Sequence, residues 1–441
     1  MATDLQSEQS ALTADQATSP STGTSTNRST GERYQRIRAM SVNIAAPLTP
    51  EDCAMQTMPD VSPTRWHLAH TTWFFETFLL KEQPGFRPFH SDFERLFNSY
   101  YNSVGEPFPR HRRGQLSRPG LEETLQYRQH VDVAVSQLID QGELNEHQRY
   151  VLELGLHHEQ QHQELMLTDI KHVLASNPLY PIYTKNTATN NNTEASLSTT
   201  LQWSETPETI VEIGHNGKGF AYDNESPRHR ELIQPHAIAD RCVTNGEYLE
   251  FINAGGYQQP EHWLSLGWTA VNENGWKAPQ YWVRGDEDWR QFTLSGLRPL
   301  DLHEPVCHVS YFEADAYARW SGKRLPTEFE WEHAATANPT GSVFADRLME
   351  SGHVIHPRTA GASDFTGNVW EWTGSQYLPY PGYRPVSGAL GEYNGKFMCN
   401  QFVLRGGSCA TSSDHIRLSY RNFFPPDARW QFSGFRLADS R

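Results

Sequence analysis

The feature of this sequence that most constrains its fold is a pair of histidines inside a long helical stretch. His158 and His162 are four residues apart in a run from Glu146 to Ala175 that contains no proline and a single glycine. Residues four apart lie one turn above each other on the same helix face, so both imidazoles can reach one point. Imidazole nitrogen is a common metal ligand. The pattern therefore predicts a metal-binding helix.

The same stretch fits a pattern of zinc peptidases. His158, Glu159 and His162 match H-E-x-x-H, in which the histidines bind zinc and the glutamate is the general base. Glu159 would point about 100° away from His158 around the helix, an offset that such enzymes tolerate. The geometry of this stretch therefore does not exclude a zinc peptidase, and the rest of the chain has to distinguish the two kinds of metal site.

Four amphipathic segments in the first part of the chain favour an antiparallel helical bundle. They are expected at about residues 34–46, 64–80, 121–141 and 146–175. His70 lies in the second segment, and bundles commonly build metal sites from facing helices, so a further imidazole can join the pair. Three imidazoles suit Zn, Cu, Fe and Ni alike, and they leave open positions for substrate or oxygen. A third ligand upstream of the pair disfavours a peptidase.

Composition limits the other classes of function. The 37 Lys and Arg residues against 52 Asp and Glu residues give a net charge of -15, which disfavours a nucleic-acid-binding surface. No uninterrupted apolar run is long enough to cross a membrane, and the polar N-terminus lacks the apolar stretch of a secretion signal. Five cysteines without framework spacing fit a reducing compartment. We therefore expect a cytoplasmic protein.

Composition also divides the chain into four parts. Residues 1–32 are expected to be a disordered tail, 33–180 the helical bundle, 181–207 a linker rich in Thr, Asn and Ser, and 208–441 a second domain. The second domain is predicted to hold short strands and irregular loops, with helices near 313–321 and 327–337.

Four short motifs mark the second domain. They are RLPTEFEWE at 324–332, GNVWEW at 367–372, RGGS at 405–408 and GFRL at 434–437. Their order resembles the formylglycine-generating-enzyme-like (sulfatase-modifying-factor) domain, a variant of the C-type-lectin-like fold. The region around His70 and the later histidine pair resembles a DinB-type bundle. Together they are similar to the ergothioneine-biosynthesis sulfoxide synthases, the EgtB family. The resemblance implies an α+β fold, a DinB-like four-helix bundle followed by a C-type-lectin-like domain.

The resemblance implies an enzyme with non-haem Fe(II) held by His70, His158 and His162. Its reaction would join the sulfur of cysteine or gamma-glutamylcysteine to the imidazole of hercynine (N-alpha-trimethylhistidine), with O2 as oxidant and a sulfoxide as product. Phe423 and Phe424 stand where mycobacterial members have tryptophan and aspartate, and that acid helps to bind gamma-glutamylcysteine. Free cysteine is therefore the expected donor.

The resemblance also points to the proton donor and to a clamp for the donor's carboxylate. Tyr101 and Tyr100, in the stretch N-S-Y-Y-N, are the candidate proton donors in that order, and Tyr377 of the second domain is the alternative. Arg110 and Arg113 are the candidate clamp, because a guanidinium group binds a carboxylate in bidentate fashion.

The expected contacts to hercynine come from both domains. Gln161 precedes a ligand histidine and should border the site, and Asn422 lies in the C-terminal stretch that lines the pocket in this family. Phe423, Phe424 and Trp430 are the expected walls, because aromatic faces hold trimethylammonium groups favourably.

Other functions remain open on the sequence. A selenoneine synthase or a 5-histidylcysteine sulfoxide synthase would have the same architecture. Formylglycine formation is disfavoured, because Thr411 and Ile416 occupy the positions of its copper-binding cysteines. A lectin-like binding module is the non-enzymatic alternative, and three convergent imidazoles disfavour it because a scaffold has no use for them.

Overall fold

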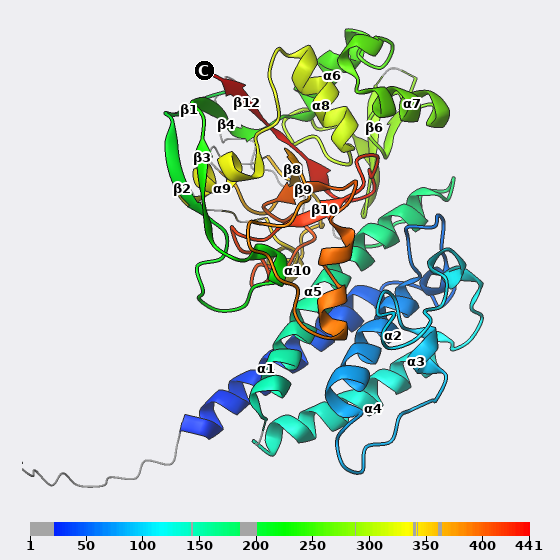
Figure 1. The fold of residues 1–441 in the computed structure, drawn as a ribbon. Helices are drawn as coiled ribbons and strands as arrows, with labels where there is room; N and C mark the ends of the chain where they lie inside the picture. Colours follow the sequence, from blue (N-terminus) through cyan, green and yellow to red (C-terminus); the bar gives the residue numbers. More distant parts are fainter. Residues whose placement is uncertain are drawn as a thin grey trace, which may run out of the picture.

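The computed structural model describes residues 22–142, 144–185, 201–286, 288–337, 341, 343–359 and 364–441. A helical bundle forms one half of the molecule and a domain of short sheets and helices forms the other (Figure 1). The long helix α5 (Glu146–Ala175) runs from the bundle into the second domain. The predicted α+β class is confirmed.

The bundle consists of four principal helices, joined by short helical turns. The principal helices are α1 (Thr22–Ala45), α2 (Thr64–Phe75), α4 (Leu121–Asp140) and α5, and the shorter elements are η1 (Asp52–Ala54), η2 (Glu76–Leu80), α3 (Phe93–Leu96) and η3 (Arg110–Gln115). Helix α5 begins and ends where the sequence predicted. Its start is fixed by a capping box, in which the Asn145 and Gln148 side chains each accept a hydrogen bond from the other's backbone N–H.

The start of α1 differs from the predicted domain boundary. Residues 1–32 were expected to be a disordered tail, but the helix already begins at Thr22, while residues 1–21 lie outside the described part. The buried Tyr34 and Ile37 anchor the helix in the bundle core. Once a helix is nucleated in this way, adding further turns costs little, even for Ser and Thr.

A glycine sets the approach of α5 to α2. A Cβ at Gly155 would lie 2.5 Å from Cε1 of the Phe75 ring and 3.0 Å from Cε1 of Phe74. Real Cβ atoms do not approach so closely, so a larger residue would push the helices apart. Gly155 therefore allows His158, one turn further along α5, to reach the side chains of α2.

The second domain contains four small sheets and five helices within the described residues. The sheet orders are β1-β4-β12, β10-β9-β8-β11, β2-β3 and β5-β6-β7, and all pairings are antiparallel except β11 with β8. The strands are β1 (Trp203–Thr206), β2 (Thr209–Ile213), β3 (His229–Ile233), β4 (His236–Cys242), β5 (Trp282–Arg284), β6 (Trp289–Thr293), β7 (Gly296–Pro299), β8 (Trp370–Gln376), β9 (Phe402–Arg405), β10 (Asn422–Phe424), β11 (Ser433–Gly434) and β12 (Arg436–Ser440). The helices are α6 (Asn245–Asn253), α7 (Ser265–Asn274), α8 (Tyr311–Trp320), α9 (Glu328–Ala337) and α10 (Ala345–Glu350).

The four sequence motifs of this domain are joined by ion pairs. Arg436 of GFRL binds Glu371 of GNVWEW through Nε and Nη2, at 2.5 and 2.7 Å. Arg405 of RGGS pairs with Glu332 of the first motif through Nη2. Both pairs are buried, and removing one partner of such a pair would leave an uncompensated charge. The motifs therefore hold the irregular domain together.

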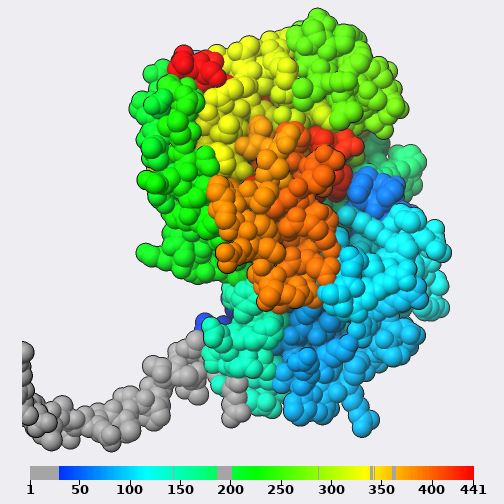
Figure 2. Space-filling model, in the orientation of Figure 1, coloured from blue at the N-terminus to red at the C-terminus, as the bar shows by residue number. Residues whose placement is uncertain are grey.

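A long excursion between β8 and β9 carries the second domain onto the bundle. It includes the short turns η6 (Ala389–Glu392) and η7 (Gly395–Phe397), drawn in orange in Figures 1 and 2. The Glu392 carboxylate accepts hydrogen bonds from the backbone N–H groups of Asn102 and Ser103, each at 3.0 Å. Nζ of Lys396 donates to the Tyr100 carbonyl. These contacts join the excursion to the loop that holds the candidate tyrosines.

The junction differs from the linker expected at 181–207. Tyr183 is buried, and its hydroxyl donates to the Ile44 carbonyl at 2.7 Å. Strand β1 already begins at Trp203, while residues 186–200 lie outside the described part. None of the helices in the described ranges combines the length and the apolar character needed to cross a membrane.

Candidate active site

Three imidazoles from two helices meet inside the bundle. His70 of α2 and His158 and His162 of α5 are each 5% exposed or less. Each offers one ligand atom, and these atoms lie within 4.8 Å of one another. Among the described residues, this is the one group of three or more His, Cys, Asp or Glu side chains placed in this way. The structure therefore brings together the three histidines that the sequence singled out.

The free nitrogens of this group fit a metal ion. His70 Nδ1 lies 2.6 Å from the Phe97 carbonyl oxygen and can only donate to it, which leaves Nε2 as the atom with a lone pair. That Nε2 and both ring nitrogens of His158 are buried and have no hydrogen-bond partner among the described residues. Burying unpaired polar atoms is costly, so their convergence points to a ligand between them. The donor set of three imidazoles suits iron, and also zinc or copper.

Burial keeps all three imidazoles neutral. It lowers the pKa of His158 to about 4 and the pKa values of His70 and His162 well below the ordinary value. A neutral imidazole keeps the lone pair that a metal requires. The site is therefore ready to bind a metal at neutral pH.

The lowered pKa values predict how the stability of the metal-free protein depends on pH. Histidines of the unfolded chain take up protons below about pH 6.5, whereas these three resist protonation in the folded state. The unfolded state then binds more protons, so the free energy of unfolding should fall as the pH is lowered from about 6.5 toward 4. Urea unfolding in the presence of a chelator would measure it. Replacing the three histidines by glutamine should reduce this dependence without abolishing it, because other buried histidines such as His308 and His415 also have lowered pKa values. An unaltered slope would contradict the assignment.

Glu159 does not face the three histidines. Its carboxylate accepts hydrogen bonds from Arg38 Nη1 at 2.8 Å, from Ser41 Oγ at 2.6 Å and from Arg128 Nη2. Burial alone would raise the pKa of Glu159, but the two guanidinium groups lower it to about 2. A peptidase base has to be free to take a proton from water at the metal. The structure therefore argues against the zinc peptidase.

The surroundings of Glu159 predict a structural role. Glu159→Gln removes the negative charge between two buried arginines, which should lower the free energy of unfolding by about 3 kcal/mol. Glu146→Gln, at an exposed position of the same helix, should change it by less than about 0.5 kcal/mol. Chemical denaturation of both variants would measure the difference. Equal stabilities would show that the charge at Glu159 is not needed.

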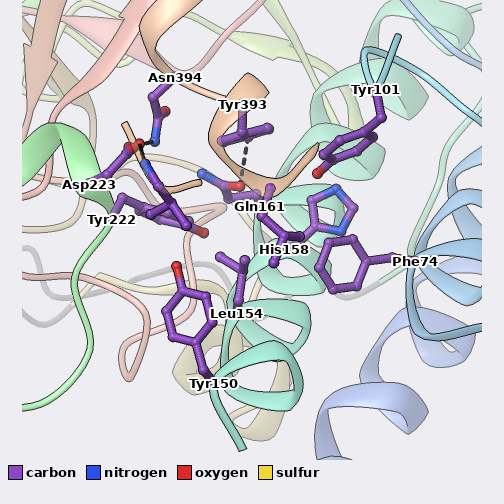
Figure 3. A pocket seen from close by; sticks show the side chains of 12 residues that line it. Phe74, Tyr101, Tyr150, Leu154, His158, Gln161, Tyr222, Asp223, Tyr393 and Asn394 are labelled. Carbon is purple, nitrogen blue, oxygen red and sulfur yellow. Dashed lines mark hydrogen bonds between the residues drawn. The ribbon is translucent and has the colours of Figure 1, made fainter. Parts of the chain in front are cut away.

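A small pocket of about 20 Å³ lies beside His158 (Figure 3). Figure 3 shows the Tyr101 hydroxyl turned toward the side of the pocket where His158 lies, with Gln161 and Tyr393 next to them. Burial raises the pKa of Tyr101, so its hydroxyl keeps the proton at neutral pH. Tyr101 therefore lines the pocket beside His158 with a protonated hydroxyl.

A larger cavity of about 310 Å³ shares Gln161, Tyr222, Tyr393 and Asn394 with the small pocket. It lies between the domains, since it is lined by Tyr100 and Arg110 of the bundle and by residues of β10 and the loop that follows it. The sequence-predicted residues Asn422, Phe423, Phe424 and Trp430 all line it. A volume of this size is within the range of small-molecule sites.

The two candidate clamp arginines have different positions. Arg110 lines the larger cavity, and its buried Nε has no hydrogen-bond partner in the described residues. Arg113 lies behind it, with its guanidinium 3.4 Å from the centre of the Trp66 ring and donating to Ser62 Oγ and Ser99 Oγ, each at 2.9 Å. Arg110 is therefore the one of the two that faces the cavity.

The two arginines act on Tyr100. Burial alone would raise the pKa of Tyr100, but the neighbouring positive charges of Arg110 and Arg113 lower it. Tyr100 lines the larger cavity, whereas Tyr101 lines the small pocket. The two adjacent tyrosines therefore line different cavities.

Tyr377, predicted as the alternative proton donor, lines neither the small pocket nor the larger cavity. Its ring stacks behind Phe423 at 4.1 Å, and its hydroxyl accepts a hydrogen bond from Asn224 Nδ2 at 2.8 Å. The second-domain tyrosine that does reach the site is Tyr393, whose hydroxyl donates to Gln161 Oε1 at 2.7 Å. The Gln161 amide in turn donates to the Tyr420 hydroxyl. Gln161 is therefore held between two tyrosines of the second domain.

Sequence reasoning missed several residues that line the larger cavity, among them one glutamate and three tyrosines. These four are Glu164, Tyr222, Tyr393 and Tyr420. Glu164 was within reach of prediction, because it lies three residues after Gln161 and therefore on the same helix face. Burial raises its pKa to about 7, and its carboxyl group accepts hydrogen bonds from Trp370 Nε1 and from Thr411 Oγ1 at 2.6 Å. The tyrosines lie in loops, for which helical period gives no signal.

Comparison with known proteins places the chain in a family. Residues 33–166 match the DinB superfamily, and residues 194–354 and 349–441 match the Sulfatase-modifying factor enzyme 1-like domain. A hercynine oxygenase of Mycolicibacterium thermoresistibile is 31% identical over 406 residues, which cover 86% of this chain and 88% of that protein. The chain belongs to the hercynine oxygenase family. The expected resemblance to the EgtB family is thereby confirmed.

Further relatives share part of the chain. The hercynine oxygenase of Mycobacterium tuberculosis is 38% identical over 238 residues, 49% of this chain and 55% of that protein. A formylglycine-generating enzyme of Streptomyces coelicolor is 32% identical over 271 residues, 51% of this chain and 84% of that protein. The second of these relatives is a formylglycine-generating enzyme. A match over half of the chain therefore does not by itself distinguish the two kinds of enzyme.

Proposed function

We propose that the protein is an Fe(II)- and O2-dependent sulfoxide synthase that joins the sulfur of cysteine to the imidazole ring of hercynine. The ring C–H of hercynine, the S–H of cysteine and O2 would give the sulfoxide and water. The observation that carries the proposal is the convergence of His70, His158 and His162 beside an interdomain cavity, in a chain of the hercynine oxygenase family. The five unpaired cysteines support the expected cytoplasmic location.

The three histidines would hold the iron and leave its remaining positions open. When bound, the iron supplies the redox chemistry that activates O2. Gln161 borders the small pocket beside His158 and the larger cavity, and its amide is fixed by two tyrosines. It can therefore orient a substrate that extends from one space into the other.

The larger cavity suits the trimethylammonium group of hercynine. Phe423, Phe424 and Trp430 provide aromatic faces, which attract quaternary ammonium groups. Glu164 adds a carboxyl group to the same lining. The cavity thus combines the two features that a bulky organic cation needs, namely an apolar wall and a nearby acid.

The arginines of the cavity favour the smaller donor. Two arginines line it, and one of them, Arg421, is fully engaged by Glu328 through bonds of 2.8 and 2.9 Å. Arg110 is the other, and its Nε is unpaired among the described residues. Arg110 Nη2 donates to the Asp60 carbonyl at 2.5 Å, and the donors that remain match the single carboxylate of cysteine better than the two of gamma-glutamylcysteine.

Tyr101 is the proposed proton donor. Tyr101→Phe removes the hydroxyl that lies near His158 and should slow sulfoxide formation at least tenfold, which corresponds to about 1.4 kcal/mol of barrier. Tyr150→Phe changes another hydroxyl of the same pocket, on an exposed residue, and serves as the matched control. Rapid-quench measurement of product formation would compare the two. A rate unchanged by Tyr101→Phe would move the role to Tyr100 or Tyr393.

The proposed reaction can be tested by mass spectrometry. Protein loaded with Fe(II) without oxygen would be given hercynine and either cysteine or gamma-glutamylcysteine, and then exposed to O2. We expect the mass of hercynylcysteine sulfoxide from cysteine, and no coupled product from His158→Ala. Coupling only with a selenium donor, or with histidine in place of hercynine, would favour a selenoneine or 5-histidylcysteine sulfoxide synthase instead.

A further inference from the structure

We propose that His67 and Asp169 are positioning residues of the metal centre, which set the ring nitrogen through which His162 binds the metal. Spacing and composition alone do not separate His67 from the other histidines of the chain. The inference rests on the proposed function, since it takes His162 as a metal ligand.

A continuous hydrogen-bonded row leads from His162 into the bundle. Nδ1 of His162 lies 2.8 Å from Nδ1 of His67, and Nε2 of His67 lies 2.9 Å from Oδ2 of Asp169. The same Oδ2 accepts the backbone N–H of Ser62 at 2.8 Å. Each of the three side chains is 5% exposed or less, so water does not compete for these bonds.

The Asp169 carboxylate, at the end of this series of hydrogen bonds, determines which ring nitrogens of His67 and His162 carry a proton. A carboxylate oxygen that already accepts the Ser62 N–H is an acceptor for His67 as well, so Nε2 of His67 carries a proton. A neutral imidazole has a single N–H, which makes Nδ1 of His67 the acceptor toward His162. The proton between the two rings then belongs to Nδ1 of His162. Its Nε2 keeps the lone pair and is the atom available to a metal.

A backbone carbonyl fixes the tautomer of His70. The Phe97 carbonyl holds the proton of His70 on Nδ1 and leaves Nε2 for the metal. His158 has no such partner at either ring nitrogen among the described residues. Two of the three imidazoles are thus set in one tautomer before a metal arrives. Of their two supports, only the His67–Asp169 pair consists of side chains and can be removed by substitution.

The effect of such hydrogen-bonding partners on metal affinity is known from other metal sites. Partners that hold the second nitrogen of a ligand histidine orient the ring and raise its basicity, and their loss weakens metal affinity about 10- to 100-fold. The carboxylate also lowers the cost of the partial positive charge that a metal places on the ring of His162. His67 and Asp169 would therefore tune affinity without touching substrate.

The test compares variants that keep or remove the acceptor. Asp169→Leu and His67→Leu should each weaken Fe(II) binding 10- to 100-fold, measured without oxygen by competition with a chromogenic chelator. Asp169→Asn keeps a carbonyl oxygen that can accept both bonds and should recover most of the affinity. His147→Leu, an exposed position on the same helix, should leave the affinity unchanged.

A second measurement needs no substitution. Long-range proton–nitrogen NMR spectra of the metal-free protein should show His162 with its proton on Nδ1 and His67 with its proton on Nε2. The opposite tautomers would overturn the inference, and so would wild-type affinity in Asp169→Leu. Absence of Fe(II) binding by the wild-type protein would instead overturn the proposed function, so the two failures can be told apart.

Discussion

The structure depends on the burial of α5 between the two domains. One part of its surface completes the bundle with α1 and α2, and another contacts the second domain along much of its length. Apolar residues of α5 such as Met166 share a buried cluster with second-domain residues such as Phe292. Buried polar contacts also cross between the domains: Glu164 bonds to Thr411, His157 to His415, and Lys171 Nζ to His308 Nε2 at 2.7 Å. Buried polar groups without partners would be costly, so these pairs hold the domains in one relative position.

This arrangement explains why the candidate site lies where it does. The histidines need the rigid bundle, because their ring nitrogens must converge within a few ångströms. The cavity needs the second domain, which supplies aromatic walls from β10 and Tyr393 from the excursion between β8 and β9. Neither domain alone would enclose both, and Gln161 on the shared helix connects them through Tyr393 and Tyr420.

Helical periodicity accounts for the parts of the fold and the site that could be predicted. The bounds of α5 and the convergence of His70 with His158 and His162 follow from spacing on packed helices. The roles of those histidines and of Tyr101 in catalysis remain predictions. The site residues on irregular loops were harder to place, since their positions depend on long-range contacts and not on local pattern. Tyr377 and Tyr393 illustrate this, because both follow β8 and yet only Tyr393 reaches the cavity.

The structure also shows how a familiar motif can mislead. In H-E-x-x-H the glutamate is expected to serve the metal, but here Glu159 is bound by two arginines of α1 and α4. Its carboxylate lies in a buried ion-pair network behind the histidines and does not face the space between them.

The geometry of the three imidazoles points to a metal between them, next to the small pocket that adjoins the interdomain cavity. Crystals grown with Fe(II) in the absence of oxygen, measured on both sides of the iron absorption edge, would test it most directly. We expect one strong anomalous peak within bonding distance of Nε2 of His70, Nε2 of His162 and one ring nitrogen of His158. A peak elsewhere, or none at this position with iron in excess, would contradict it.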